Sequence, residues 1–243
     1  MKKKTIIILS IVLILILVGV WFFGSLFGIF KPKDLGIRYT KADYQSILQK
    51  SGLEVVFEAK TGSDLKAYID DTKGDKLYID DYNFTFSEYE QKKFTITPEE
   101  ATAFLNEFAP SFFWFKNMQV NVLADGTMEE SSTVDIGKLK VELYADVADK
   151  VPVPIPNKVN IYSKGLFTVT DNKLTLQPEQ ILVGKVPVPK KYIEGNNLSV
   201  FSKYLERIYN IVPGFKVNSF KADGKGNFYF DGIIPQKVIV TKK

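Results

Sequence analysis

Neither cysteine nor histidine occurs among the 243 residues of the chain. Without cysteine, the protein forms no disulfide, offers no thiolate nucleophile and carries no lipid-modified cysteine. Without histidine and cysteine, serine–histidine catalysis, cysteine–histidine catalysis and ordinary zinc coordination are excluded. Any catalytic chemistry would therefore depend on carboxylates.

The carboxylates show no arrangement typical of a catalytic or metal site. Asp80 and Asp81 are neighbours in a β-rich stretch, and neighbouring residues of a strand point to opposite faces. Residues 223–227 lack the further ligands of a calcium loop and indicate a hairpin turn instead. We therefore predict that the protein is not an enzyme and has no catalytic residue, metal or cofactor. A carboxylate-dependent hydrolase is an alternative that only the presence of these acids supports.

Arginine is scarce as well, because only Arg38 and Arg207 occur among the 32 basic residues. When the three lysines at the N-terminus are set aside, 29 basic residues remain against 28 acidic ones, a net charge of +1. Such a near-neutral balance gives no electrostatic reason to expect nucleic acid as a partner.

The longest uncharged segment lies near the N-terminus, at residues 5–30, directly after three lysines. A bilayer core requires roughly 20 apolar residues, so this segment is long enough to span a membrane. The preceding lysines predict a cytoplasmic N-terminus and an extracytoplasmic C-terminal part of a single-pass cell-membrane protein. A cleaved signal peptide is the alternative, but its apolar region usually has only about 7–15 residues.

The sequence divides into four parts. Residues 1–30 form the predicted transmembrane anchor, and residues 31–38 form a short tether. Residues 39–93 contain a helix and β-rich stretches, and this α+β segment is either separate or part of the same domain as the rest. Residues 94–243 form the main domain, in which we expect a sheet and a long helix.

Three helices are expected after the anchor. Thr40 and Thr97 each precede an acidic residue three positions later, which is the capping-box pattern of a helix start. A third helix is expected from Asn197 to Val212, where apolar residues recur at helical spacing. Its apolar stripe consists of Leu198, Phe201, Tyr204, Leu205, Ile208, Ile211 and Val212.

Strands are expected around three turns, at Asp125-Gly126, Asp171-Asn172 and Asp223-Gly224. Paired strands and separated helices, without alternating βαβ units, indicate an α+β fold. The expected architecture is an N-terminal transmembrane helix followed by a curved antiparallel β-sheet packed on amphipathic helices.

Two apolar features have alternative interpretations. The tetrapeptide Val-Pro-Val-Pro occurs at residues 151–154 and 186–189, and proline confines both copies to sheet edges or extended linkers. Either copy covers the end of a core or the mouth of a cavity. The aromatic stretch 109–117 is either a core segment or an apolar lip that meets the membrane or a lipid.

Several short motifs occur in a characteristic order. They are the helix start at 94–108, the G-x-V-P-x-P stretch at 184–189, Pro213-Gly214, Asp223-Gly224 and the Gly-Ile-Ile-Pro stretch at 232–235. Over about residues 94–235 the chain resembles the YpmS-type family of membrane-anchored exported proteins of Gram-positive bacteria. That family is similar to tubular lipid-binding (TULIP-like) domains, in which a curved antiparallel sheet wraps a long helix around an apolar tunnel.

The resemblance implies a lipid or another long apolar ligand in a cavity between sheet and helix, bound without catalysis. The predicted lining residues are Phe104, Leu105 and Phe108 of one helix and Phe201, Leu205 and Ile208 of the other. Phe112 and Trp114 are the predicted entrance residues. The expected partners are the lipid and the membrane, the latter through residues 5–30, and no protein partner is identified. The alternative is a solidly packed module that binds other cell-envelope components.

Overall fold

The computed structural model describes residues 31–58, 82–108, 115–135, 158–193 and 212–242. The anchor predicted for residues 5–30 lies outside these ranges, as does the helix predicted from Asn197. In the described ranges, no helix is long and apolar enough to cross a membrane. The first Val-Pro-Val-Pro stretch and the aspartate pair at Asp80-Asp81 also lie outside them.

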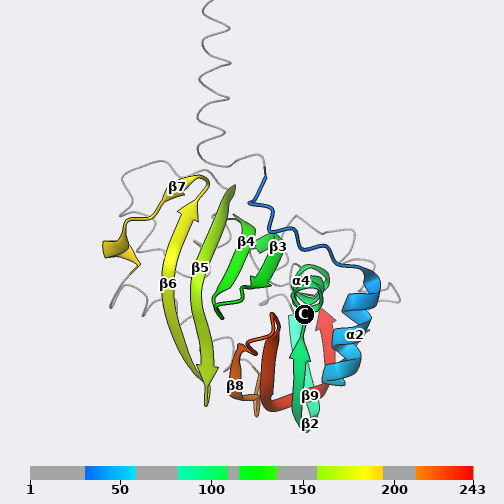
Figure 1. Cartoon of the computed structure of the whole chain (residues 1–243). Coiled ribbons are helices and arrows are strands. Elements are labelled where there is room, and N and C mark those ends of the chain that lie inside the picture. The colour runs from blue at the N-terminus through cyan, green and yellow to red at the C-terminus, as the bar shows by residue number, and fades with distance from the viewer. Residues whose placement is uncertain (1–30, 59–81, 109–114, 136–157, 194–211, 243) are drawn as a thin grey trace, which may run out of the picture.

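Two α-helices, one 3-10 helix and nine strands occur in the described ranges, and Figure 1 shows their arrangement. In chain order they are α2 (Lys41–Ser51), β1 (Glu54–Glu58), β2 (Tyr82–Ile96), α4 (Pro98–Glu107), β3 (Phe115–Val122), β4 (Met128–Asp135), β5 (Lys158–Thr170), β6 (Lys173–Val183), β7 (Val186–Pro187), η3 (Lys190–Tyr192), β8 (Lys216–Ala222) and β9 (Phe228–Lys242).

The predicted fold class is wrong, because the described chain is mostly one mixed sheet with two short α-helices. β1 runs parallel to β9, whereas every other pair in the described sheet is antiparallel. α2 and α4 have only 11 and 10 residues, and neither has the apolar length of the expected membrane helix. The prediction failed because hairpins have local turn signals, while the parallel pair joins Glu54 to Lys237, which no local pattern reports.

Two long strands hold the sheet together because each is shared by several partners. β9 pairs with β2 along one edge, while its other edge pairs first with β8 and then with β1. β5 pairs with β6 along one edge, while its other edge pairs first with β4 and then with β8. β8 therefore joins two groups of strands, one around β5 and one around β9 (Figure 1).

Both described α-helices begin as their sequences predict. The Thr40 hydroxyl of α2 accepts a hydrogen bond from the Asp43 amide, and the Asp43 carboxylate accepts one from the Thr40 amide. Thr97 and Glu100 make the same reciprocal pair at the start of α4. Gly52 ends α2 at a φ of 72°, a left-handed conformation that glycine adopts without steric cost.

Helix α4 covers the edge of β3, which has a strand neighbour, β4, on only one side in the described sheet. The Asn106 amide group donates to the Met118 carbonyl at 2.7 Å and accepts from the Met118 amide at 3.0 Å. The Thr102 hydroxyl accepts from the Val120 amide at 3.2 Å. Side chains of α4 thus replace the ladder bonds of a further strand and leave this edge less open to pairing with another chain.

The predicted tether lies directly on the sheet. The Leu35 amide donates to the Gln119 side-chain oxygen at 2.6 Å, and the Lys33 ammonium lies 3.5 Å from the centre of the Tyr162 ring. Tyr162 in turn donates its hydroxyl to Glu129, and burial together with this carboxylate raises the pKa of Tyr162 to about 12. Residues 31–38 therefore connect β3, β4 and β5 across one face.

Two apolar clusters lie along β9. The first contains Val238 and Val240, with Leu53, Val55, Phe84, Phe86 and Phe108 packed against them. The second contains Val169, Val217, Phe230 and Ile234, with partly buried aromatic and aliphatic residues around them. We call the first cluster the closed core; the second surrounds the cavity described next.

Candidate functional site

A cavity of about 390 Å³ lies between the two helices and the sheet. Every described residue of its wall is apolar, and six of the twelve are phenylalanine. The wall residues are Ile47, Ile96, Ala101, Phe104, Leu105, Phe167, Val169, Phe215, Val217, Phe220, Phe228 and Phe230. The volume falls within the roughly 300–1,000 Å³ of typical small-molecule sites.

The sheet wall arises from residues at alternate positions of its strands. Phe167 and Val169 of β5 lie on one face, and so do Phe228 and Phe230 of β9, because strand side chains alternate between faces. Phe220 of β8 connects the two strands. Its ring meets Phe167 edge-on at 5.8 Å and stacks on Phe228 at 5.6 Å. Such aromatic pairs hold the rings in defined positions around the space.

The opposite wall is one stripe of α4. Ala101, Phe104 and Leu105 follow the i, i+3, i+4 spacing that places residues on one helix face. Ala103 of the same helix is completely buried and is absent from the described cavity wall. One face of α4 thus borders the cavity while another packs tightly.

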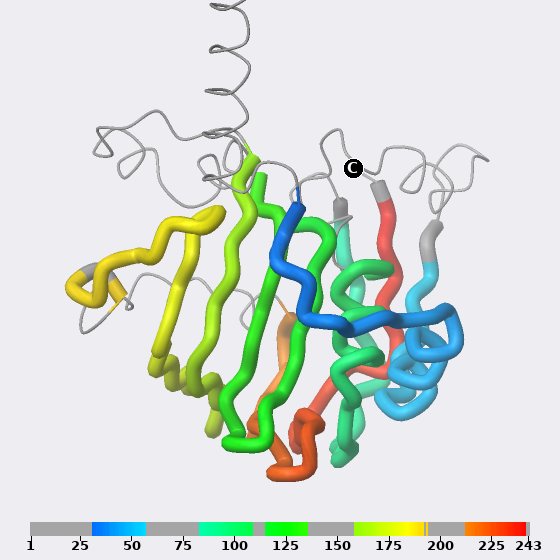
Figure 2. The backbone as a smooth tube through the Cα atoms, turned by 45° about the horizontal axis from the view of Figure 1, so that its top comes forward, coloured from blue at the N-terminus to red at the C-terminus, as the bar shows by residue number. Residues whose placement is uncertain are grey.

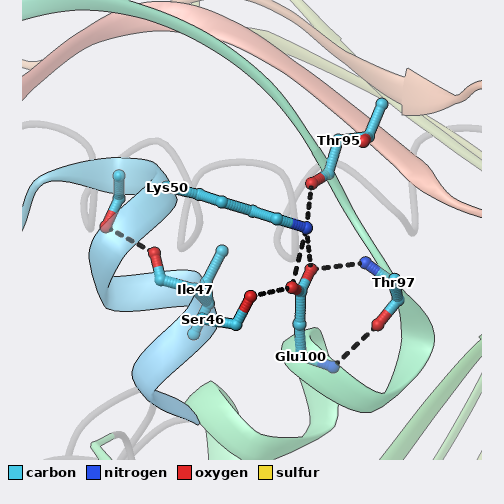
Figure 3. A network of polar contacts seen from close by, with 7 residues as sticks. Ser46, Ile47, Lys50, Thr95, Thr97 and Glu100 are labelled. Atoms are coloured by element: carbon cyan, nitrogen blue, oxygen red, sulfur yellow. Dashed lines mark hydrogen bonds and ion pairs between the residues drawn. The ribbon is translucent and has the colours of Figure 1, made fainter. Parts of the chain in front are cut away.

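A polar clasp fastens α2 to α4 beside the cavity (Figure 3). The Lys50 ammonium lies 2.7 Å from one Glu100 oxygen, and the Ser46 hydroxyl donates to the same oxygen at 2.6 Å. The other Glu100 oxygen accepts from the Thr97 amide at 2.9 Å. Lys50 also donates to the Thr95 carbonyl at 3.2 Å. Glu100 therefore caps its own helix and binds the neighbouring one.

The surroundings of Glu100 act on its pKa in opposite directions. Burial opposes ionisation, but hydrogen bonds from Lys50, Ser46 and Thr97 together outweigh it and lower the pKa of Glu100. The carboxylate is therefore ionised at neutral pH and retains its bonds to α2. This clasp holds Ile47 and Ala101, which lie next to its members in the two helices, at the cavity wall.

Glu130 is a second unusual acid. It pairs across the ladder with Ser163, on the same face of β5 as Phe167 and Val169. Burial raises the pKa of Glu130, and the Ser163 hydroxyl donates to its carboxyl group at 3.2 Å. Two such groups do not form a nucleophile–base pair with an orienting third group, and no cluster of metal-binding side chains occurs in the described ranges. This arrangement offers a polar contact on an apolar face.

The structure places the predicted lining residues in different surroundings. Phe104 and Leu105 border the cavity, whereas Phe108 packs against the closed core. The rings of Phe104 and Phe108 stack at 5.2 Å, so they connect the two regions. The remaining predicted residues lie outside the described ranges; they are Phe112, Trp114, Phe201, Leu205 and Ile208.

Most of the sheet wall was missed by sequence reasoning. The available signal was the alternation of large apolar residues beside predicted turns, as in Phe228 and Phe230 after the Asp223-Gly224 turn. That alternation identifies an inward face but does not identify which inward residues meet at one space. Ile47, in the interior of α2, and Ile96, at the end of β2, had no signal beyond their apolar character.

A more open groove of about 570 Å³ lies beside β2. It is bordered by Phe84, Thr85, Phe86, Tyr89, Pro213 and Gly214. Its border includes polar and exposed residues, so it lacks the uniformly apolar character of the cavity wall. We therefore take the cavity under α4 as the candidate site.

Comparison of the chain with protein-family models, curated proteins and solved structures finds no match. The similarity to the YpmS-type family and to tubular lipid-binding domains stays a prediction from the sequence. The functional argument therefore depends on the chemistry of the cavity.

Proposed function

We propose that the protein is a membrane-anchored extracytoplasmic protein that binds a lipid or another long apolar molecule in the cavity under α4, without catalysis. The observation that supports this proposal is the wall itself, in which every described residue is apolar. Residues 5–30 anchor the chain in the cell membrane, with the N-terminus in the cytoplasm.

Leaving this cavity empty would destabilise the folded protein. The space is only partly enclosed, so without an occupant its phenylalanine-rich wall would be exposed to water, at a cost of about 25 cal/mol per Å² of apolar surface. Water in this space would find no polar partner in the described wall. An apolar ligand is the occupant that removes this cost.

A hydrocarbon chain suits the wall. Each methylene transferred from water contributes about 0.8 kcal/mol, so ten buried methylenes contribute about 8 kcal/mol before the costs of association. The phenylalanine rings provide broad apolar contact without a directional requirement, so the site selects for length and apolarity. Placement beside a membrane supplies ligands of this class.

The test is ligand retention by the complete chain. The protein is purified in detergent and examined by native mass spectrometry, and the bound material is extracted with organic solvent. We expect a copurifying lipid in the unmodified chain and its loss in Leu105→Trp, which fills the cavity. Leu166→Trp is the matched control, because Leu166 is 41% exposed on β5 and does not border the cavity.

The outcome separates the proposal from its alternative. Retention that is equal in Leu105→Trp and Leu166→Trp would contradict binding in this cavity. A bare mass for the unmodified chain, with no uptake of an apolar dye, would support a solidly packed cell-envelope interaction module instead.

A further inference from the structure

The turn after β6 carries an exposed apolar tip. Val186 is 43% exposed, and Pro187 and Pro189 are exposed beside it. We call residues 185–191 the β7 tip. Val186 is one of four large apolar residues that are markedly exposed in the described ranges.

All charged side chains of the β7 tip are basic. Lys185, Lys190 and Lys191 are all exposed, and no acidic residue occurs between Gln180 and Ile193. Lysines flank the exposed valine and prolines on both sides, and apolar residues next to basic ones are a combination that binds the surface of a membrane with anionic lipids.

The β7 tip is held in a fixed shape. Val186 and Pro187 pair with the end of β6, and the Val188 amide donates to the Ile181 carbonyl at 2.9 Å. Ile193 is buried just beyond η3 and fixes the far end. Because proline cannot donate to a ladder, the tip is a poor template for another strand while its apolar surface stays exposed.

The β7 tip also lies on the side of the molecule where a membrane is expected. β7 lies at the same end of the molecule as the start of the described chain, which both views show (Figures 1 and 2). The predicted anchor joins the chain at that end, at residue 31. A membrane that holds the anchor is therefore on the side of the tip.

We propose that the β7 tip binds the surface of an anionic membrane. Val186, Pro187 and Pro189 enter the headgroup region, and Lys190 pairs with a lipid phosphate, while the charges of Lys185 and Lys191 add to the attraction. The proposal depends on the anchored location given under Proposed function, but not on the ligand in the cavity. With residues 31–38 bonded to β3 and β5, the tip supplies a second attachment and fixes the orientation of the domain.

The absence of cysteine makes the test direct. Val186→Cys carries an environment-sensitive fluorophore at one defined position of the full chain, which is reconstituted in vesicles of phosphatidylcholine with or without phosphatidylglycerol. Leu166→Cys is the matched control, since Leu166 is exposed to the same degree. The ladder places Val186 level with Ile161, with Val183 of β6 between them, and Leu166 lies five residues farther along β5, about 17 Å in the strand direction at 3.3 Å per residue.

We expect a blue shift of emission at position 186 in the anionic vesicles and none at position 166. The shift decreases when Lys190 and Lys191 are replaced by glutamine. It also decreases in about 1 M salt, where the Debye length falls to about 3 Å. Equal, water-like emission at both positions in chains that float with the vesicles would overturn the β7-tip proposal alone. Chains that fail to float with vesicles would overturn the anchored location as well.

Discussion

The side chains at even positions of β9 enter two different surroundings. Near its start, Phe228 and Phe230 border an open space, whereas near its end Val238 and Val240 lie in the closed core. The hydrophobicity of the two ends is similar, but their shapes differ. Bulky rings that stack on one another leave a space between them, while small branched side chains allow neighbouring rings to fill the gap.

Helix α4 spans both regions and shows the same contrast. Its first turns carry Ala101, Phe104 and Leu105 at the cavity, and Phe108 follows at the closed core. Its two polar attachments also differ in place, with Glu100 beside the cavity and Asn106 toward the other end. Substitutions along this helix therefore compare a hollow region with a filled one in a single element.

The largest difference in the free energy of unfolding is expected between substitutions at two alanines of α4. Ala103→Leu adds three carbons where no space exists, so we expect a loss of about 3 kcal/mol in the free energy of unfolding. Ala101→Leu adds the same carbons at the cavity wall, and the expected loss is below about 1 kcal/mol. Urea denaturation of both variants measures the difference. Equal losses would mean that the space beside Ala101 is filled.

A second pair of substitutions removes side-chain atoms instead of adding them. Val240→Ala deletes two carbons from the closed core, which costs about 2–3 kcal/mol from lost transfer energy and a new cavity. Val169→Ala removes the same atoms from a wall that already borders a space, so we expect about 1–2 kcal/mol. Thermal unfolding compares them, and a larger loss at Val169 would contradict the comparison.

The attachment of α4 to β3 is the next test. Asn106→Ala leaves the amide and the carbonyl of Met118 without their side-chain partner, and we expect a loss of about 2 kcal/mol. Hydrogen exchange at the Met118 amide should become faster, while ligand retention stays close to that of the unmodified chain. Unchanged protection of this amide would show that α4 does not secure the edge of β3.

The smallest loss of stability is expected from a substitution at the cavity end of α4. Glu100→Gln keeps the cap but removes the ion pair with Lys50, which we expect to cost about 1–2 kcal/mol at pH 7.

The difference in stability between the unmodified protein and Glu100→Gln should depend on pH with a defined sign. Because the folded pKa of Glu100 is lowered from 4.5, its contribution is fully present above pH 4.5 and is lost as the pH falls through the folded value. The stabilities of the two proteins should therefore converge in acid, as denaturation at pH 7 and below pH 4 would measure. A constant difference over that range would exclude the ionised clasp.

Local structure was predictable where the signal is local. The capping boxes at Thr40 and Thr97 and the turns at Asp125-Gly126, Asp171-Asn172 and Asp223-Gly224 occur as expected, because each depends on contacts within a few residues. Of the lining residues that the resemblance implied, the structure places Phe104 and Leu105 at the cavity.

Other features depend on distant contacts and had no local signal. The parallel pairing of β1 with β9 joins residues far apart in the chain, such as Glu54 and Lys237, and the bonds of Asn106 depend on the approach of α4 to β3. Phe108 was assigned to the same site as Phe104, yet one helical turn is enough to move it to the closed core. Whether an apolar interior is filled or hollow depends on how rings from β5, β8 and β9 meet.

The side-chain bonds of α4 to β3 form a weaker connection than the ladder between β4 and β5. Separating β4 from β5 requires the loss of eight paired positions, whereas detaching α4 from β3 breaks three hydrogen bonds of Asn106 and Thr102 to that strand. Under load or near the unfolding temperature, the contact between α4 and β3 should therefore break before the β4–β5 ladder does. The apolar wall of the cavity would then be exposed to solvent, while the β4–β5 ladder remains intact.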